Sequence, residues 1–363
     1  MISSARKPAG SPMIIKWVVT MTATENKRGF RHYGRHIPGL NIPSFKTALK
    51  WRGADLQTLR NTIVGPSMTL TPDFERVSFS IDGGHILKAA YHPSLKSDVL
   101  PVIIIIHGLA GDETSANVIS SAAYFISLGF PVLRLNLRGA GPSAETSVGP
   151  YHGGLSADLA QVVTQAQGYG AGVVLYGISL GGNMMLKYLG EQGTAAPVRA
   201  AIAVSAPLCL KTVQIRLMES RNRLYHNYLL LGMRNYAKQM AGQHEADLIA
   251  RARAAKSLYE FDDQFTAPAH GMSGAEEYYR LNSAQKFIDH IRVPTLIIHA
   301  RNDPWIPVED YLARSWNSAG AISLLIAEDG GHVGFHGKGH AVPWHERVAA
   351  EFMGHMVRQE VAA

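Results

Sequence analysis

The chain has 363 residues, of which 46% are hydrophobic and 17% are charged, so it can bury a large core and is not expected to be disordered as a whole. Its single cysteine, Cys209, excludes an internal disulfide framework and any zinc or iron–sulfur site built from several cysteines. The net charge of +7 arises in residues 1–52, which hold ten Lys or Arg residues and one acid, but no recognition motif accompanies them and nucleic acid is not an expected partner.

Residues 1–52 are predicted to form a basic N-terminal arm that is solvated or partly packed on the rest of the protein. Its most apolar stretch, residues 13–21, is interrupted by Lys16 and is much shorter than the roughly 20 residues that span a bilayer. The stretch also lacks the clear cleavage site of a signal peptide. We therefore expect a soluble, cytoplasmic protein, with peripheral contact between the arm and an anionic membrane surface as the alternative.

Residues 53–208 show the alternation of strands and helices expected of the first part of an α/β core. Segments 76–82 and 85–92 flank a Gly-Gly turn and predict an antiparallel hairpin. The run PVIIII at 101–106 is continuously apolar, as in a strand buried on both faces of a parallel sheet. The segments that follow predict a mostly parallel sheet with helices on both faces, from strands at 131–137, 172–178 and 200–206 and helices at about 113–128, 155–168 and 181–190.

Residues 209–291 interrupt this alternation with a stretch of helical composition that contains no β-rich run. The sheet pattern resumes in residues 292–363, the second part of the core, with strands at 295–300 and 322–327. An insertion between two strands of one sheet predicts a helical lid over the carboxyl ends of the strands. The many Leu and Tyr residues of the lid predict an acyl-binding surface, and packing among the helices would explain the same composition equally well.

Residues 177–181, Gly-Ile-Ser-Leu-Gly, follow an apolar strand and open a helix, which is the context that a G-x-S-x-G motif requires. Glycines two residues to either side of Ser179 allow a sharp turn in which strand and helix approach closely. The serine is then presented at a helix N-terminus, where the helix dipole favours negative charge. The motif predicts that Ser179 is a nucleophile; the alternative is a Gly-rich turn with a capping serine.

A serine nucleophile needs a base and an orienting acid, and in this fold the chain order is serine, acid, histidine. Asp303 follows the strand at 295–300, and His332 lies in a glycine-flanked loop after the last strand. Both residues are expected on the same rim of the sheet as Ser179, so we predict a triad of Ser179, Asp303 and His332. Other acids compete for the role of Asp303, namely Asp329, three residues before His332, and the Asp262-Asp263 pair of the insertion.

An oxyanion needs two preorganised backbone donors. We predict the N–H of Leu180, just after the nucleophile, and the N–H of Leu109 in the loop His107-Gly108-Leu109-Ala110-Gly111, with the neighbouring Ala110 as the alternative to Leu109. His107 itself is expected to be structural.

Neither a metal nor another cofactor is expected. His332, His336 and His340 recur at four-residue intervals, but the glycines between them argue against a helix that would align them as ligands. No Walker loop or G-x-G-x-x-G follows a strand. Cys209 is expected to be a small packed residue.

In combination, several motifs resemble the YheT-like branch of the α/β-hydrolase superfamily (the AB-hydrolase-4 group) over about residues 50–355. The motifs are DLQTL at 55–59, HGLAG at 107–111, RLNLRGAGPS at 134–143, GISLGGN at 177–183, FDDQFTAP at 261–268, the pair Tyr278-Tyr279, NDPWIP at 302–307 and GGHVGF at 330–335. The resemblance implies a serine hydrolase acting on carboxylic esters, with relatives that handle acylglycerols, phospholipid acyl chains or medium-chain ethyl esters. By motif match, its charge-relay residues are Ser179, Asp303 and His332, although relatives often carry two acids where this chain has Asn302-Asp303.

The sequence thus predicts a serine esterase whose substrate is a small acyl ester, lipid-like or of medium chain length. Two alternatives remain open. An acyltransferase would use the same triad and pass the acyl group to an alcohol instead of water. A non-catalytic binding protein on this fold would tolerate the loss of triad residues, and all three are present.

Overall fold

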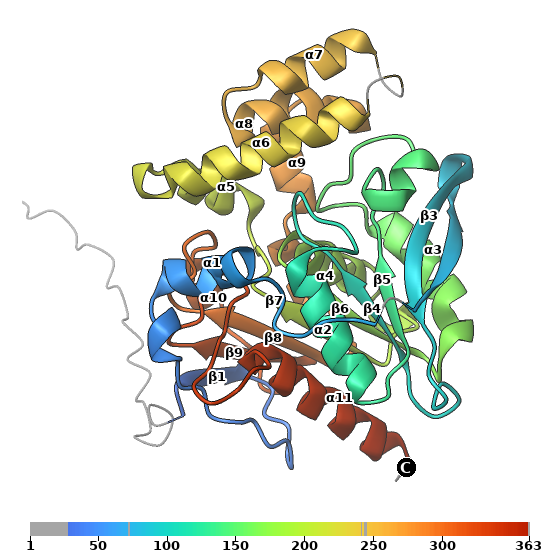
Figure 1. The fold of residues 1–363 in the computed structure, drawn as a ribbon, viewed down its shortest axis with the longest axis vertical. Helices are drawn as coiled ribbons and strands as arrows, with labels where there is room; N and C mark the ends of the chain where they lie inside the picture. Colours follow the sequence, from blue (N-terminus) through green and yellow to red (C-terminus); the bar gives the residue numbers. More distant parts are fainter. Residues whose placement is uncertain (1–27, 72, 241, 243–244, 362–363) are drawn as a thin grey trace, which may run out of the picture.

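The computed structural model describes residues 28–71, 73–240, 242 and 245–361. Its centre is a sheet of strand order β1-β9-β8-β7-β6-β4-β5-β3-β2 (Figure 1). The six adjacent strands β9, β8, β7, β6, β4 and β5 are parallel to one another. The pairs β1–β9, β3–β5 and β2–β3 are antiparallel. The strands are β1 (Phe30–Gly34), β2 (Glu75–Ile81), β3 (His85–His92), β4 (Val102–Ile106), β5 (Val132–Leu135), β6 (Val173–Ile178), β7 (Ala200–Val204), β8 (Thr295–Ala300) and β9 (Ile322–Ala327).

Helices cover both faces of the sheet because the central strands are apolar on both sides. Along β4, Ile103 and Ile105 pack into one core with α2 and α11, whereas Ile104 and Ile106 pack into the other with α3 and α4. These helices are α2 (Ala116–Ser127), α3 (Ser156–Ala166), α4 (Leu180–Gln192) and α11 (Trp344–Val361). The predicted fold class, a mostly parallel sheet with helices on both faces, is confirmed.

Between β7 and β8 the chain forms a block of helices beyond the carboxyl ends of the strands (Figure 1). The block consists of α5 (Leu210–Met218), α6 (Arg223–Gln239), α7 (Ala246–Ala254), α8 (Leu258–Phe261) and α9 (Ala275–Asn282). Two more short helices belong to the core, α1 (Ala54–Val64) and α10 (Glu309–Leu312). In the described parts of the chain, no helix has both the length and the apolar character needed to cross a membrane.

The predicted arm is in part an element of the sheet. Residues 1–27, which include the apolar stretch at 13–21, lie outside the described residues. Residues 30–34 form β1, which pairs with β9 in the register Phe30 with Ala327. Only Phe30 of this strand is fully buried, so its sequence shows none of the continuous apolar character that marks the central strands.

Candidate active site

Ser179 lies at the turn from β6 into α4, with φ 51° and ψ −120°. The glycines around it are required by close packing. A Cβ on Gly177 would lie 2.7 Å from the Cα of Gly182, and a Cβ on Gly181 would lie 2.5 Å from the carbonyl oxygen of His107. The close packing that these glycines allow holds the turn in place, although Ser179 has a strained backbone conformation. The serine lies at the carboxyl end of β6 and lines a cavity whose other walls include α5 and α6.

The structure brings the three residues of the predicted triad into one hydrogen-bonded chain. Nε2 of His332 lies 3.0 Å from Oγ of Ser179, and Nδ1 lies 2.9 Å from Oδ2 of Asp303. The other carboxylate oxygen accepts the N–H groups of Trp305 and Ile306 at 2.8 and 3.0 Å. The Asp303 side chain is fully buried and that of His332 is 5% exposed. Three donors thus fix the carboxylate, which in turn orients the imidazole towards the serine.

The competing acids have other partners. Asp329 accepts hydrogen bonds from the side chain of Asn302 at 2.6 Å and from the N–H of Gly330 at 2.8 Å. Asp262 accepts the hydroxyl of Tyr279 at 2.8 Å, and Asp263 caps α9 by accepting the N–H of Ala275 at 3.0 Å. Of the four candidate acids, all of which are described in the structure, Asp303 alone is hydrogen-bonded to the His332 ring.

Helix α1 holds the loop that carries His332, a role that the sequence analysis did not assign. Thr58 Oγ1 accepts the backbone N–H of His332 at 2.9 Å and donates to the carbonyl of Ala54 at 2.7 Å. The buried amide of Gln57 bonds both the N–H and the C=O of His336, at 2.7 and 3.1 Å. A Cβ on Gly331 would lie 2.4 Å from the Ala54 carbonyl oxygen, so loop and helix are in direct contact.

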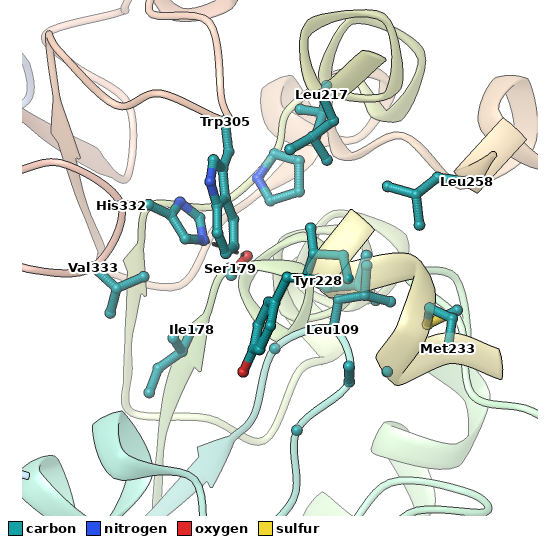
Figure 2. Close-up of a pocket in the computed structure, with 18 of the residues that line it drawn as sticks. Leu109, Ile178, Ser179, Leu217, Tyr228, Met233, Leu258, Trp305, His332 and Val333 are labelled. Atoms are coloured by element: carbon teal, nitrogen blue, oxygen red, sulfur yellow. Dashed lines mark hydrogen bonds between the residues drawn. The ribbon is translucent and has the colours of Figure 1, made fainter. Parts of the chain in front are cut away.

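Trp305 is a second residue that the sequence analysis missed. Its ring stacks on the His332 imidazole, with ring centroids 4.2 Å apart and planes at 29° (Figure 2). The stack restricts rotation of the imidazole and covers one of its faces. The only sequence signal was the position of Trp305 two residues after Asp303 in the NDPWIP motif.

The loop at 107–111 lies against the serine. A Cβ on Gly108 would lie 3.2 Å from Cβ of Ser179, and Ala110 has a positive φ of 56°. His107 supports this loop, because its Nδ1–H donates to the Gly108 carbonyl at 2.9 Å while Nε2 accepts the N–H of Leu137 at 3.2 Å. Burial lowers the pKa of His107, so it is neutral and structural.

Both predicted oxyanion donors border the serine. Leu180 is the first residue of α4, where backbone N–H groups have no partner within the helix. Leu109 lies in the loop just described, and both residues line the cavity in front of Ser179.

That cavity has a volume of about 580 Å³ and extends from Ser179 between the core and the helical block. Figure 2 shows Trp305 and His332 at one side of it and Leu258 and Met233 at the other. Its lining is mainly apolar, with Asp262 among the few charged groups. Burial raises the pKa of Asp262 to about 6.

The histidines that recur at four-residue intervals have separate surroundings. His332 contacts Ser179 and Asp303, His336 is buried behind α1, and His340 is exposed. Burial lowers the pKa of His336 to about 3. Across the described residues, no group of three or more His, Cys, Asp or Glu side chains could hold a metal ion.

Comparison with known proteins points to one family. The model of the alpha/beta hydrolase fold family matches residues 101–338. YheT of Escherichia coli is 29% identical over 288 residues, 78% of this chain and 84% of that protein. The medium-chain fatty acid ethyl ester synthase/esterase 2 of Saccharomyces cerevisiae is 30% identical over 281 residues, 70% of this chain and 62% of that protein.

A monoacylglycerol lipase of the same yeast is 29% identical over 278 residues, 72% of this chain and 61% of the lipase. Among solved structures, an esterase of Pyrococcus furiosus superposes with a TM-score of 0.52 at 14% identity, covering 80% of this chain and 95% of the esterase. At that identity the structural likeness concerns the fold alone.

Proposed function

Because this chain belongs to the α/β-hydrolase family, in its YheT-like branch, we propose that it is a serine hydrolase of carboxylic esters in which Ser179 is the nucleophile. The observation that carries the proposal is the hydrogen-bonded chain from Ser179 through His332 to Asp303, with distances of 3.0 and 2.9 Å. The names of the relatives support ester chemistry.

In the proposed reaction, Oγ of Ser179 attacks the ester carbonyl while Nε2 of His332 takes its proton. Asp303 keeps the proton of the imidazole on Nδ1 and stabilises the cation that forms. The C–O bond to the alcohol then breaks, and His332 returns the proton to the departing alkoxide. Water then attacks the acyl-enzyme while the same imidazole takes its proton. The bond between the acyl carbon and Ser179 Oγ breaks, His332 returns the proton to Oγ, and the acid and the free serine are released.

The negative charge of the tetrahedral intermediate needs donors that are in place before the reaction. We assign this role to the N–H groups of Leu180 and Leu109, because both residues line the cavity in front of Ser179. The N-terminus of α4 adds the positive end of its dipole. Donors of this kind are worth about 10²- to 10³-fold in rate each.

The acyl group is proposed to be lipid-like or of medium chain length, and to lie in the apolar cavity below α5 and α6. About 580 Å³ of cavity volume lies within the range typical of small-molecule sites. The helical block at 209–291 would then be the lid that forms the far wall of the acyl site.

Two measurements test the proposal. We expect the protein to react with a fluorophosphonate probe and to hydrolyse p-nitrophenyl esters, and Ser179→Ala to lose both properties. Ser273→Ala, which alters an exposed serine of the helical block, is the matched control and should retain both. Labelling of the Ser179→Ala protein would show that a different residue is the nucleophile.

Chain length is tested separately with acyl groups from C2 to C12. A maximum at medium length supports an apolar acyl site, and a flat profile contradicts it. Transfer of the acyl group to an alcohol is the second candidate activity, favoured by the relative named as an ethyl ester synthase/esterase. Ester formation on addition of ethanol, absent in Ser179→Ala, would establish it.

A further inference from the structure

Helix α6 is apolar on the side that packs within the helical block and also on an exposed side that borders the cavity. Its inner side is buried in the core of the helical block through Tyr225, Leu229, Met233 and Tyr236, among others. A surface helix normally has polar residues on its opposite side. The exposed apolar side of α6 therefore needs an explanation of its own.

Three large apolar residues form that side. Leu224, Tyr228 and Leu231 are 83%, 64% and 57% exposed. Their spacing of four and three residues places them in one row along the helix. We call Leu224, Tyr228 and Leu231 the outer row of α6.

The outer row lies at the mouth of the candidate acyl site. Tyr228 and Leu231 line the cavity that contains Ser179, and Asn61 and Thr62 of α1 line it as well. Directly after them, at the end of α1, Ile63 and Val64 are 62% and 55% exposed. Exposed apolar side chains thus belong to two of the elements from which the mouth is built.

The charged side chains of α6 itself are all positive. Helix α6 contains Arg223, Arg234 and Lys238 and no Asp or Glu. Arg234 donates a hydrogen bond to the carbonyl of Ala255. The other two cationic side chains, those of Arg223 and Lys238, are exposed. On the neighbouring segment, Arg221 is paired with Asp55 at 3.2 Å.

We propose that the outer row of α6 and the end of α1 dock on an anionic lipid surface, so that an acyl ester can pass from the lipid into the cavity without crossing water. The inference rests on the proposed ester hydrolysis, since the docking surface surrounds the same cavity. Apolar side chains with cationic neighbours are the combination that binds a helix to an anionic interface. A protein partner or a second copy of this chain would match the apolar row and leave the positive charges unexplained.

The test measures binding of the full-length protein to vesicles by co-sedimentation. The double variant Leu224→Ser with Ile63→Ser is suitable because neither residue lines the cavity. We expect wild type to bind phosphatidylglycerol-containing vesicles more tightly than pure phosphatidylcholine vesicles, and the double variant to bind the former at least about fivefold more weakly. Leu95→Ser with Val99→Ser, two exposed apolar residues in the loop between β3 and β4, is the control and should bind like wild type.

Activity separates this proposal from the one on which it rests. The double variant should turn over a dissolved short-chain ester at the wild-type rate and lose rate only on vesicle-bound substrate. Ser179→Ala should be inactive and bind vesicles normally. If wild type hydrolyses no ester but its binding still depends on Leu224 and Ile63, the proposed function fails and the docking surface stands.

Three outcomes would overturn the docking surface. Unchanged binding of the double variant would assign any lipid contact to another part of the chain. Equal binding to anionic and neutral vesicles would remove the role of the charges. Self-association that the double variant abolishes, without vesicle binding by wild type, would identify the row as a contact between copies of this chain.

Discussion

The rim of the sheet and the helical block above it are built in opposite ways. At the rim, Ser179, Asp303 and His332 are held by short hydrogen bonds and by glycines packed against backbone atoms. In the block, α6 borders an apolar cavity and exposes large side chains to solvent. The closely held rim suits the chemistry of bond cleavage, and the apolar cavity wall of the block suits selection among acyl chains. Changes at the rim should therefore alter the rate with all substrates, whereas changes in the block should alter their ranking.

The largest effect is expected from Asp303→Asn at the rim. An amide cannot stabilise the imidazolium and favours the wrong tautomer of His332, so kcat should fall by about 10⁴-fold with esters of every chain length. Asp329→Asn is the matched control, because that carboxylate bonds Asn302 and not the His332 ring. Steady-state kinetics of both variants decide the point. A larger loss in Asp329→Asn would show that Asp329 is the orienting acid.

In the block, Leu258→Trp should change selectivity. Leu258 lines the cavity on the side away from His332 (Figure 2), so the larger indole ring of a tryptophan there should shorten the space for an acyl chain. We expect kcat/KM for a C12 ester to fall by about 10- to 100-fold while the value for a C2 ester stays within about twofold, since apolar contacts of this size are worth about 1–3 kcal/mol. Ile215→Trp, outside this cavity, is the control. Equal losses for both esters would contradict the contrast between rim and block.

A smaller effect at the rim is expected from Thr58→Val. The change removes the acceptor of the His332 backbone N–H and leaves that donor without its bond, which costs about 1–3 kcal/mol. Because Thr58 acts by positioning the histidine loop, we expect kcat to fall about tenfold with KM nearly unchanged, and Thr58→Ser to restore it. The thermal unfolding temperature of each variant shows whether a lower kcat comes from a displaced His332 loop or from a smaller fraction of folded protein. Failure of Thr58→Ser to restore kcat would exclude the hydroxyl as the cause.

These residues also show what the sequence could predict. The central strands can be predicted because strands buried on both faces are continuously apolar, whereas β1 has one fully buried side chain and its sequence does not distinguish it from the basic arm. Ser179, Asp303 and His332 could be located because each follows a strand of the same sheet. Trp305 and Thr58 could not, since their roles depend on contacts between distant segments that no local pattern records.

The stability of the core is also expected to depend on pH. Glu346 lies on α11 in the core, is 1% exposed, and accepts the hydroxyl of Ser121 at 2.9 Å. Burial raises the pKa of Glu346 from 4.5 to about 8. The native protein thus keeps a proton that the unfolded chain releases above about pH 4.5, so the free energy of unfolding should decline as the pH rises from about 4.5 to about 8.

Glu346→Gln isolates this contribution, because an amide of the same shape has no proton to lose. We expect its free energy of unfolding, relative to wild type, to increase by at least about 1 kcal/mol between pH 5 and pH 8. Glu351→Gln, an exposed position on the same helix, should show no such trend. Denaturant unfolding at several pH values measures both. If the free energy of unfolding changes with pH in the same way in wild type and in Glu346→Gln, Glu346 is ionised in the native protein. The core would then tolerate a buried negative charge.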